Sequence, residues 1–204
     1  MRKIINFTFV LAFLFIGTTK VQAVDFGLEF GFGVDTSKDW SSSIDRAYEA
    51  YDYSLNLNAF FEAQVGVPIG ITEDFLLKPK VSYLTGFAFY YDYNQKDQKD
   101  VYRDSFIIPG IAAEYHLNGH QGNSFFIGAE VGTIRASSGS EGHYDFDNGG
   151  ISYGVYGGYN FSGGSKISLG YREIPIDVTY LDGYKESKNF GGFSLQFVYT
   201  FWLQ

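Results

Sequence analysis

Apolar and polar residues alternate along most of the chain after residue 24, with the period of two that is typical of β-strands. The pattern is clearest near the end, where Phe193, Leu195, Phe197, Tyr199 and Phe201 occupy every second position. Eight segments follow it and are predicted to be strands: 25–34, 54–67, 75–91, 105–117, 125–136, 150–161, 166–176 and 191–203. The chain is therefore predicted to be all-β.

The connections between these segments alternate in length. Residues 68–74, 118–124 and 162–165 form short connections, whereas residues 35–53, 92–104, 137–149 and 177–190 form long polar ones. Consecutive antiparallel strands place all short connections at one end and all long ones at the other. This is the plan of an eight-stranded antiparallel up-and-down transmembrane β-barrel, with short periplasmic turns and long extracellular loops.

The two faces of the predicted strands differ sharply. One face carries Phe, Leu, Ile, Val and Tyr without a charge, and the other carries Gly, Ser, Asn and the charged residues. An eight-stranded lumen is just wide enough for side chains to fill it, so the bulky apolar face cannot point inward. We expect it to face lipid, where a closed barrel satisfies every backbone group. A secreted β-sandwich or lipocalin-like cup with an aromatic core is the alternative.

Three local features test this assignment. Pro79 and Pro109 lie within predicted strands, where each removes a hydrogen-bond donor, so a bulge is expected at each. After Glu173 the apolar positions change parity, which predicts a bulge that switches the faces. Aromatic girdles are expected at both ends of the strands. The candidates are Tyr91 and Tyr93 at the loop end, and Tyr115, Tyr159, Phe161 and Trp202 at the turn end.

The first 23 residues read as a signal peptide. Two basic residues precede an apolar run at 7–16, and Val21-Gln22-Ala23 is an acceptable cleavage site, which predicts Sec export and a mature domain of residues 24–204. Cleavage would remove three basic residues and no acid, so the formal net charge would change from −8 to −11. A nucleic-acid partner is not expected of such a chain. The absence of cysteine excludes disulfides, thiolate metal sites and lipid attachment to cysteine.

Together these features resemble the small bacterial outer-membrane barrels of the OmpA/OmpX type, over the whole mature chain. Leu195, Phe197, Tyr199 and Phe201 are similar to the C-terminal signal of that family. Three further residues follow, which indicates either a divergent lineage or Leu203 in the place of the terminal aromatic residue. The resemblance implies a monomer in the outer membrane, with lipid as its surroundings and the barrel assembly machinery as its partner during biogenesis. The OmpA-like and porin-like expectation covers the barrel alone, because no peptidoglycan-binding domain follows.

Charged residues on the polar face are predicted to meet inside the barrel. They are Glu29, Glu62, Lys78, Lys80, Glu114, Glu130 and Arg172, all about 10–20 Å from the periplasmic rim at ~3.3 Å per residue. Buried charges persist only when they are paired and hydrogen-bonded, so these residues are expected to form one network in one layer. The network either plugs the lumen as a polar core or forms a narrow proton or ion path.

The long loops hold −8 of the mature charge, which predicts a structural or surface-interaction (adhesin-like) role through an extracellular protein or other surface ligand. A small pore that uses the lumen network is the alternative. A lipid-modifying enzyme is a third possibility, for which only His143 lies at the correct end. The stretch Asp145-Phe146-Asp147-Asn148-Gly149 faintly matches a calcium loop but lacks the other ligand positions. We expect no catalysis, cofactor or metal.

Overall fold

The computed structural model describes residues 25–37, 53–91, 99–138 and 144–203, and it describes no side chains at 53–58, 87–91, 99–102 and 138. Eight strands close a barrel: β1 (Asp25–Thr36), β2 (Tyr53–Gly66), β4 (Phe75–Tyr91), β5 (Lys99–His116), β6 (Ser124–Thr133), β9 (Ile151–Asn160), β10 (Ser165–Glu173) and β13 (Phe193–Leu203). Each pairs antiparallel with its neighbours, and β13 returns to β1. Among the described residues, no helix is long and apolar enough to cross a membrane.

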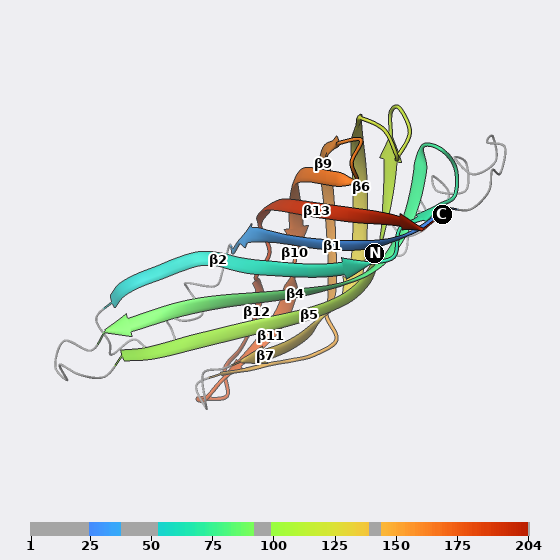
Figure 1. Cartoon of the computed structure of the whole chain (residues 1–204). Helices are drawn as coiled ribbons and strands as arrows, with labels where there is room; N and C mark the ends of the chain where they lie inside the picture. Colours follow the sequence, from blue (N-terminus) through green and yellow to red (C-terminus); the bar gives the residue numbers. More distant parts are fainter. Residues whose placement is uncertain (1–24, 38–52, 92–98, 139–143, 204) are drawn as a thin grey trace.

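The pairing confirms the predicted eight-stranded up-and-down barrel. Phe26 on β1 lies opposite Leu203 on β13, so both ends of the barrel domain lie at the end with the short turns. β2, β4 and β5 continue past the other strands at the opposite end (Figure 1). We call these two ends of the barrel the turn end and the loop end.

The predicted inside-out polarity is also confirmed. Outward side chains are apolar and exposed at the outer surface, with exposed fractions of 71% at Phe32, 67% at Ile127 and 71% at Phe193. Inward positions carry buried charges, and Glu29 and Glu62 are exposed by only 1% and 3%. The apolar side chains face outward because eight strands enclose too little space for them.

Five shorter strands complete the fold. They are β3 (Ile69–Gly70), β7 (Arg135–Ser138), β8 (Tyr144–Phe146), β11 (Pro175–Tyr180) and β12 (Lys185–Asn189). β3 and β7 extend the barrel wall, whereas β8, β11 and β12 form a separate three-stranded sheet at the loop end. This separate sheet, which we call the cap sheet, was not predicted.

The cap sheet corrects the expected course of the seventh strand. Barrel pairing ends at Glu173, and the chain continues into β11 of the cap sheet rather than through a bulge in the barrel wall. Ile174, Ile176 and Val178 are buried between the cap sheet and the barrel strands. Their change of parity therefore marks a change of sheet, which places these side chains in a core.

The bulges expected at the two prolines are absent. β4 and β5 pair without a register shift from Phe75↔Tyr115 to Tyr91↔Lys99. On the other side of β5, the hydrogen-bond ladder is interrupted next to Pro109, which has no N–H to donate. The interruption lies between the pairs Gly110↔Gly132 and Ile107↔Arg135, and the register is the same on both sides of it. Ile134 instead donates its N–H to Gly150 O at 2.8 Å. Pro109 therefore divides the neighbouring strand into β6 and β7.

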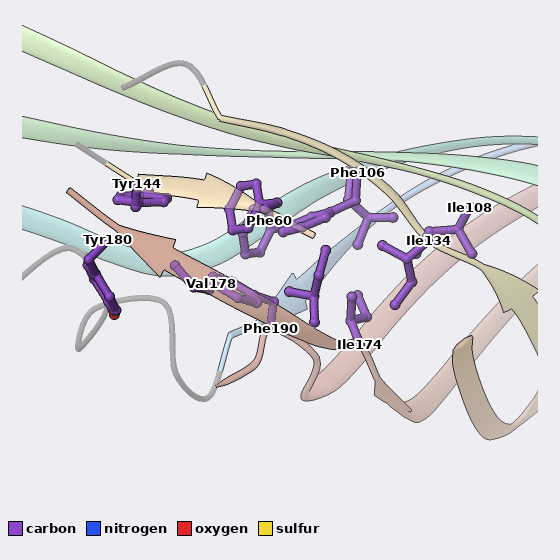
Figure 2. Close-up of a cluster of buried hydrophobic side chains, with 12 residues drawn as sticks. Phe60, Phe106, Ile108, Ile134, Tyr144, Ile174, Val178, Tyr180 and Phe190 are labelled. Carbon is purple, nitrogen blue, oxygen red and sulfur yellow. The ribbon is translucent and has the colours of Figure 1, made fainter. Parts of the chain in front are cut away.

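An apolar cluster fills the loop end of the lumen. It joins inward side chains of the barrel with the inner face of the cap sheet: Phe60, Leu84, Phe106, Ile108, Ile134, Tyr144, Phe146, Ile174, Ile176, Val178, Tyr180 and Phe190. Figure 2 shows these rings and aliphatic groups meeting between the strands. The Phe106 ring lies 5.2 Å from Phe60, 5.5 Å from Phe146 and 5.4 Å from Phe190, measured between centroids. We call this group the cap cluster.

The girdle candidates are placed as follows. Tyr115, Tyr159 and Phe161 lie on the outward face at the turn end. Trp202 instead has inward parity on β13, and its ring lies 4.8 Å from that of His120. The Tyr91 side chain and Tyr93 lie outside the described residues.

Candidate functional site

The charged lumen is the candidate site, and the structure places all seven predicted charged residues inside the barrel. They do not form one layer. Two separately closed groups lie one above the other along the barrel axis, because inward residues two apart on one strand, such as Lys78 and Lys80 on β4, lie at different heights. The expectation of a single layer was therefore wrong in its geometry.

The group nearer the turn end is a ring of two acids and two bases: Glu29, Lys78, Glu114 and Lys166. Lys78 Nζ lies 2.7 Å from both Glu29 Oε1 and Glu114 Oε1. Lys166 Nζ closes the ring at 3.1 Å from Glu29 Oε2 and 2.9 Å from Glu114 Oε2. We call it the ion quartet, and its formal charges balance.

Lys166 was missed as a member of the network. The predicted strand began at this residue, so it was taken for a strand end. Its parity matches that of Ser168 and Arg172, which were assigned inward, so the signal was present in the sequence. Its side chain is almost completely buried.

Tyr156 and His116 hold the quartet in place. Tyr156 donates its hydroxyl to Glu114 Oε1 at 3.0 Å, and His116 Nε2 lies 3.2 Å from Glu114 Oε2. The Tyr156 ring occupies the space left by Gly128, where an added Cβ would lie only 2.6 Å from Tyr156 Cζ. A glycine on β6 therefore allows the aromatic ring on β9 to reach over β6 to Glu114 on β5.

The second group lies toward the loop end and is centred on Arg172. Its guanidinium donates to Glu130 Oε1 at 2.6 Å, to Glu62 Oε1 at 3.1 Å and to Asp35 Oδ2 at 3.1 Å. Lys80 Nζ contacts Glu130 Oε2 at 2.6 Å. Three carboxylates thus meet two cations in a buried space.

Two glutamines close this second group into a ring. Lys80 donates to Gln64 Oε1 at 2.9 Å, Gln64 Nε2 lies 3.4 Å from Gln196 Oε1, and Gln196 Nε2 donates to Glu62 Oε2 at 2.7 Å. The circuit Arg172–Glu130–Lys80–Gln64–Gln196–Glu62 returns to its starting point, and we call it the arginine ring. Both glutamines have the inward parity of their strands, but the predicted network was limited to charged residues.

Asp35 was assigned to the first long loop, and this was wrong. β1 continues to Thr36, and Asp35 lies on its inward face with 1% exposure. Asp104, assigned to the second loop, is also buried and accepts a hydrogen bond from Tyr144 at 2.5 Å. The exposed loop charge is therefore smaller than the sequence count implied.

The turn end of the lumen is covered by the connection between β5 and β6. Gly119 adopts φ 81°, a conformation suited to glycine, and donates its N–H to Asp74 Oδ1 at 3.0 Å. His120 follows and contacts Glu73 O through Nδ1 at 2.6 Å, while Asn160 donates to His120 O at 2.9 Å. The turn is thus fixed to both neighbouring parts of the wall, at the start of β4 and the end of β9. Burial lowers the pKa of His120.

The described residues offer no other obvious chemistry. None of their His, Asp and Glu side chains form a group of three or more that could hold a metal ion. Asp145 is exposed on the outer face of β8, and Asn148 uses its Oδ1 to accept the N–H of Ala136 at 2.7 Å. His143 lies outside the described residues.

The four residues of the proposed C-terminal signal share the outward face of β13, between β1 and β10. Leu195, Phe197, Tyr199 and Phe201 are 39–53% exposed. Their recognition by an assembly machinery stays a prediction.

No protein-family model matches the sequence, and no curated protein matches it. Two solved structures are similar in shape. Neisserial surface protein A has a TM-score of 0.49 at 15% identity, with coverage of 90% of this chain and 99% of that one. Outer membrane protein AlkL, solved in lipid bilayers, has a TM-score of 0.41 at 15% identity, with coverage of 91% and 94%.

Proposed function

We propose that the chain is an integral outer-membrane β-barrel without catalytic activity, which does not conduct and which acts through the surface at its loop end, in a structural or adhesin-like role. The observation that carries this proposal is a lumen that, in the described residues, is occupied by paired charged groups and an apolar cluster beneath an apolar outer wall. The wall supports the membrane location, the filled lumen argues against a pore, and the cap supports a surface role.

The outward belt has the height of a bilayer core. On β13 it extends over the 11 residues from Phe193 to Leu203. At ~3.3 Å per residue and a tilt of about 40°, this strand rises about 25 Å, which is the height of the apolar band of outer-membrane barrels. Tyr83, Tyr153 and Tyr171 face outward near the loop-end edge of the belt and suit a lipid–water interface.

The filled lumen favours a sealed barrel over the pore alternative. From the turn end, a path along the axis meets the turn at His120, the ion quartet, the arginine ring and the cap cluster. Every charged member of the two rings contacts an opposite charge, so an ion would have to displace a paired group to pass.

The cap sheet supports a role at the cell surface. Its inner face is fixed by the cap cluster, and its outer face presents Asp145, Asp177 and Lys185. The hairpin between β11 and β12 exposes Leu181 by 74% and Tyr184 by 45%. Exposed aromatic and aliphatic groups on a fixed scaffold suit protein contacts.

Two experiments test the proposal. Folded protein should migrate faster than boiled protein on gels, and proteases added to intact cells should cleave only at the loop end. In planar bilayers the purified protein should give no steady conductance, and Glu62→Gln should be equally silent. A steady conductance that Glu62→Gln abolishes would establish the pore instead.

The surface role has its own test. Cells that carry the wild-type barrel should adhere to immobilised extracellular-matrix proteins more than cells that carry Leu181→Ser/Tyr184→Ser, at equal surface amount. Equal adhesion of both, at the level of cells without the barrel, would contradict the adhesin-like role. Lipid A mass spectra should not change on overexpression, and a new lipid species would contradict the proposed lack of catalysis.

A further inference from the structure

Two arginines interrupt the apolar outer wall at the loop-end edge of the belt. Arg103 on β5 and Arg135 on β7 are exposed and have outward parity. The two arginines are the only charged residues among the described outward positions of β4, β5, β6 and β7. All other described residues at these positions are apolar, hydroxyl-bearing or small. Two positively charged side chains on this part of the wall stand out in a chain of net charge −8.

Hydroxyl groups hold Arg103 against the wall. Its Nε donates to Thr85 Oγ1 at 3.1 Å, and its Nη2 donates to the hydroxyl of Tyr83. The Tyr83 hydroxyl also lies 3.1 Å from Ser105 Oγ. The side chain is thus oriented before any ligand arrives, which lowers the entropy lost on binding.

The direction of the Arg103 side chain is unexpected for a residue beyond the belt. The register pairs Arg103 with Phe87, yet its guanidinium reaches Tyr83, four residues closer to the turn end. A solvated arginine at this edge would extend away from the apolar surface. Here the charge points back toward the belt, to the level at which lipid head groups lie.

Arg135 lies beside the same place. It is opposite Ile107, and Ile107 is opposite Tyr83 on the other side. The two arginines therefore lie at the two ends of the row Tyr83–Ile107: Arg103 contacts Tyr83, and Arg135 is paired with Ile107. We call Tyr83, Thr85, Arg103, Ser105 and Arg135 the rim cluster. Directly toward the turn end, Val81, Ile107 and Val131 are each 47% exposed and form an apolar surface.

We propose that the rim cluster binds the phosphate group of an outer-leaflet lipid whose acyl chains cover this apolar surface. Guanidinium groups match the geometry of phosphate, and hydroxyl groups supply further hydrogen bonds. The acidic groups of the chain oppose such a ligand elsewhere on the loop end. Nearby Asp104 does not oppose it, because its carboxylate is directed inward and is 1% exposed. This inference rests on the proposed membrane location.

The test measures which lipid the folded barrel retains. Wild-type protein is folded into phosphatidylcholine vesicles that contain either bisphosphorylated lipid A or its dephosphorylated form, extracted in detergent, and examined by native mass spectrometry. Arg103→Gln/Arg135→Gln removes the rim charges. Lys185→Gln removes one exposed positive charge from the cap sheet and serves as the control for each single arginine substitution.

Wild-type protein should retain the phosphorylated lipid in preference to the dephosphorylated one. Each arginine substitution should weaken retention about fivefold and the pair about thirtyfold, as expected for basic groups at an anionic membrane surface. The cap control should behave as wild type. Arg103→Lys/Arg135→Lys keeps the charge and should restore part of the preference if the glutamine variant folds poorly.

Three results would overturn the inference: equal retention by wild type and the glutamine variant, equal loss in the cap control, or full displacement of the lipid by millimolar inorganic phosphate, which would indicate a phosphate site independent of lipid. Failure of the membrane proposal is a different observation, because the wild-type protein would then not enter vesicles as a heat-modifiable species.

Discussion

The substitution Arg172→Met tests whether the arginine ring is held together by its central charge. Arg172 is 3% exposed and contacts Asp35, Glu62 and Glu130. Methionine approximates its length without its charge. The variant leaves three buried carboxylates with Lys80 as the remaining cation of the ring.

The cost follows from the burial of these carboxylates. Removal of one partner from a buried ion pair destabilises proteins by about 3–5 kcal/mol, because the remaining charge has lost both water and its partner. At about 2 kcal/mol per molar urea, the unfolding midpoint should fall by about 2 M. Lys185→Met removes a cation whose pair with Asp147 is mostly exposed, and it should cost about 0–1 kcal/mol.

The assay is urea unfolding of the barrel in lipid vesicles, followed by the gel shift of the folded form and by Trp fluorescence. The double variant Arg172→Met/Glu62→Gln should be less destabilised than the sum of the two single variants, because each removes part of the same contact. A loss below about 1 kcal/mol for Arg172→Met would contradict this prediction, since it would mean that the ring is solvated or neutral.

Three further predictions concern the ends of the barrel. Phe106→Ala should remove the centre of the cap cluster at a cost of about 3–5 kcal/mol, and limited proteolysis should then cut the cap sheet while the barrel still shows its gel shift. Burial lowers the pKa of His120, so the folded chain favours the neutral imidazole ring. The stability that the neutral ring contributes is fully present above the ordinary pKa of about 6.5 and is lost as the pH falls below that value. His120→Gln should therefore reduce the decrease in urea midpoint between about pH 8 and pH 5, and an identical decrease in both proteins would contradict this reading. Phe201→Ala should slow assembly in cells and leave unfolded protein in the periplasm, whereas Leu203→Ala, outside the proposed signal, should assemble normally.

The barrel itself could be predicted because the alternation that specifies it can be read within each strand separately. Alternation along each strand assigns every residue to one face, and a narrow lumen decides which face lies inside. The seven charged residues of the lumen followed directly from parity. Lys166 and Asp35 have the same parity as their predicted neighbours. Asp35 was missed because its strand was predicted to end at residue 34, and Lys166 because it was the first residue of its predicted strand.

The cap could not be predicted in the same way. β8 contains three residues and β12 reads Lys-Glu-Ser-Lys-Asn, which has little strand propensity. Inward apolar residues such as Phe60 and Phe106 conflict with a polar lumen until the cap sheet that covers them is known. Parity identifies the face of a residue but not what packs against it. The pairing of Lys78 with both Glu29 and Glu114 likewise depends on strands far apart in sequence.

In the proposed membrane location, the apolar side chains of this barrel face lipid while its charges face the lumen. Neighbouring residues Ile127 and Phe126 on β6 point to opposite sides, with exposed fractions of 67% and 3%. The test starts from a protein in which Trp40 and Trp202 are replaced by Phe. Either Ile127→Trp or Phe126→Trp then introduces a single tryptophan, and its fluorescence is measured in vesicles whose acyl chains carry bromine, a quencher. We expect strong quenching for Ile127→Trp and little for Phe126→Trp. Quenching of the tryptophan at position 126, with the one at position 127 open to aqueous quenchers, would contradict it.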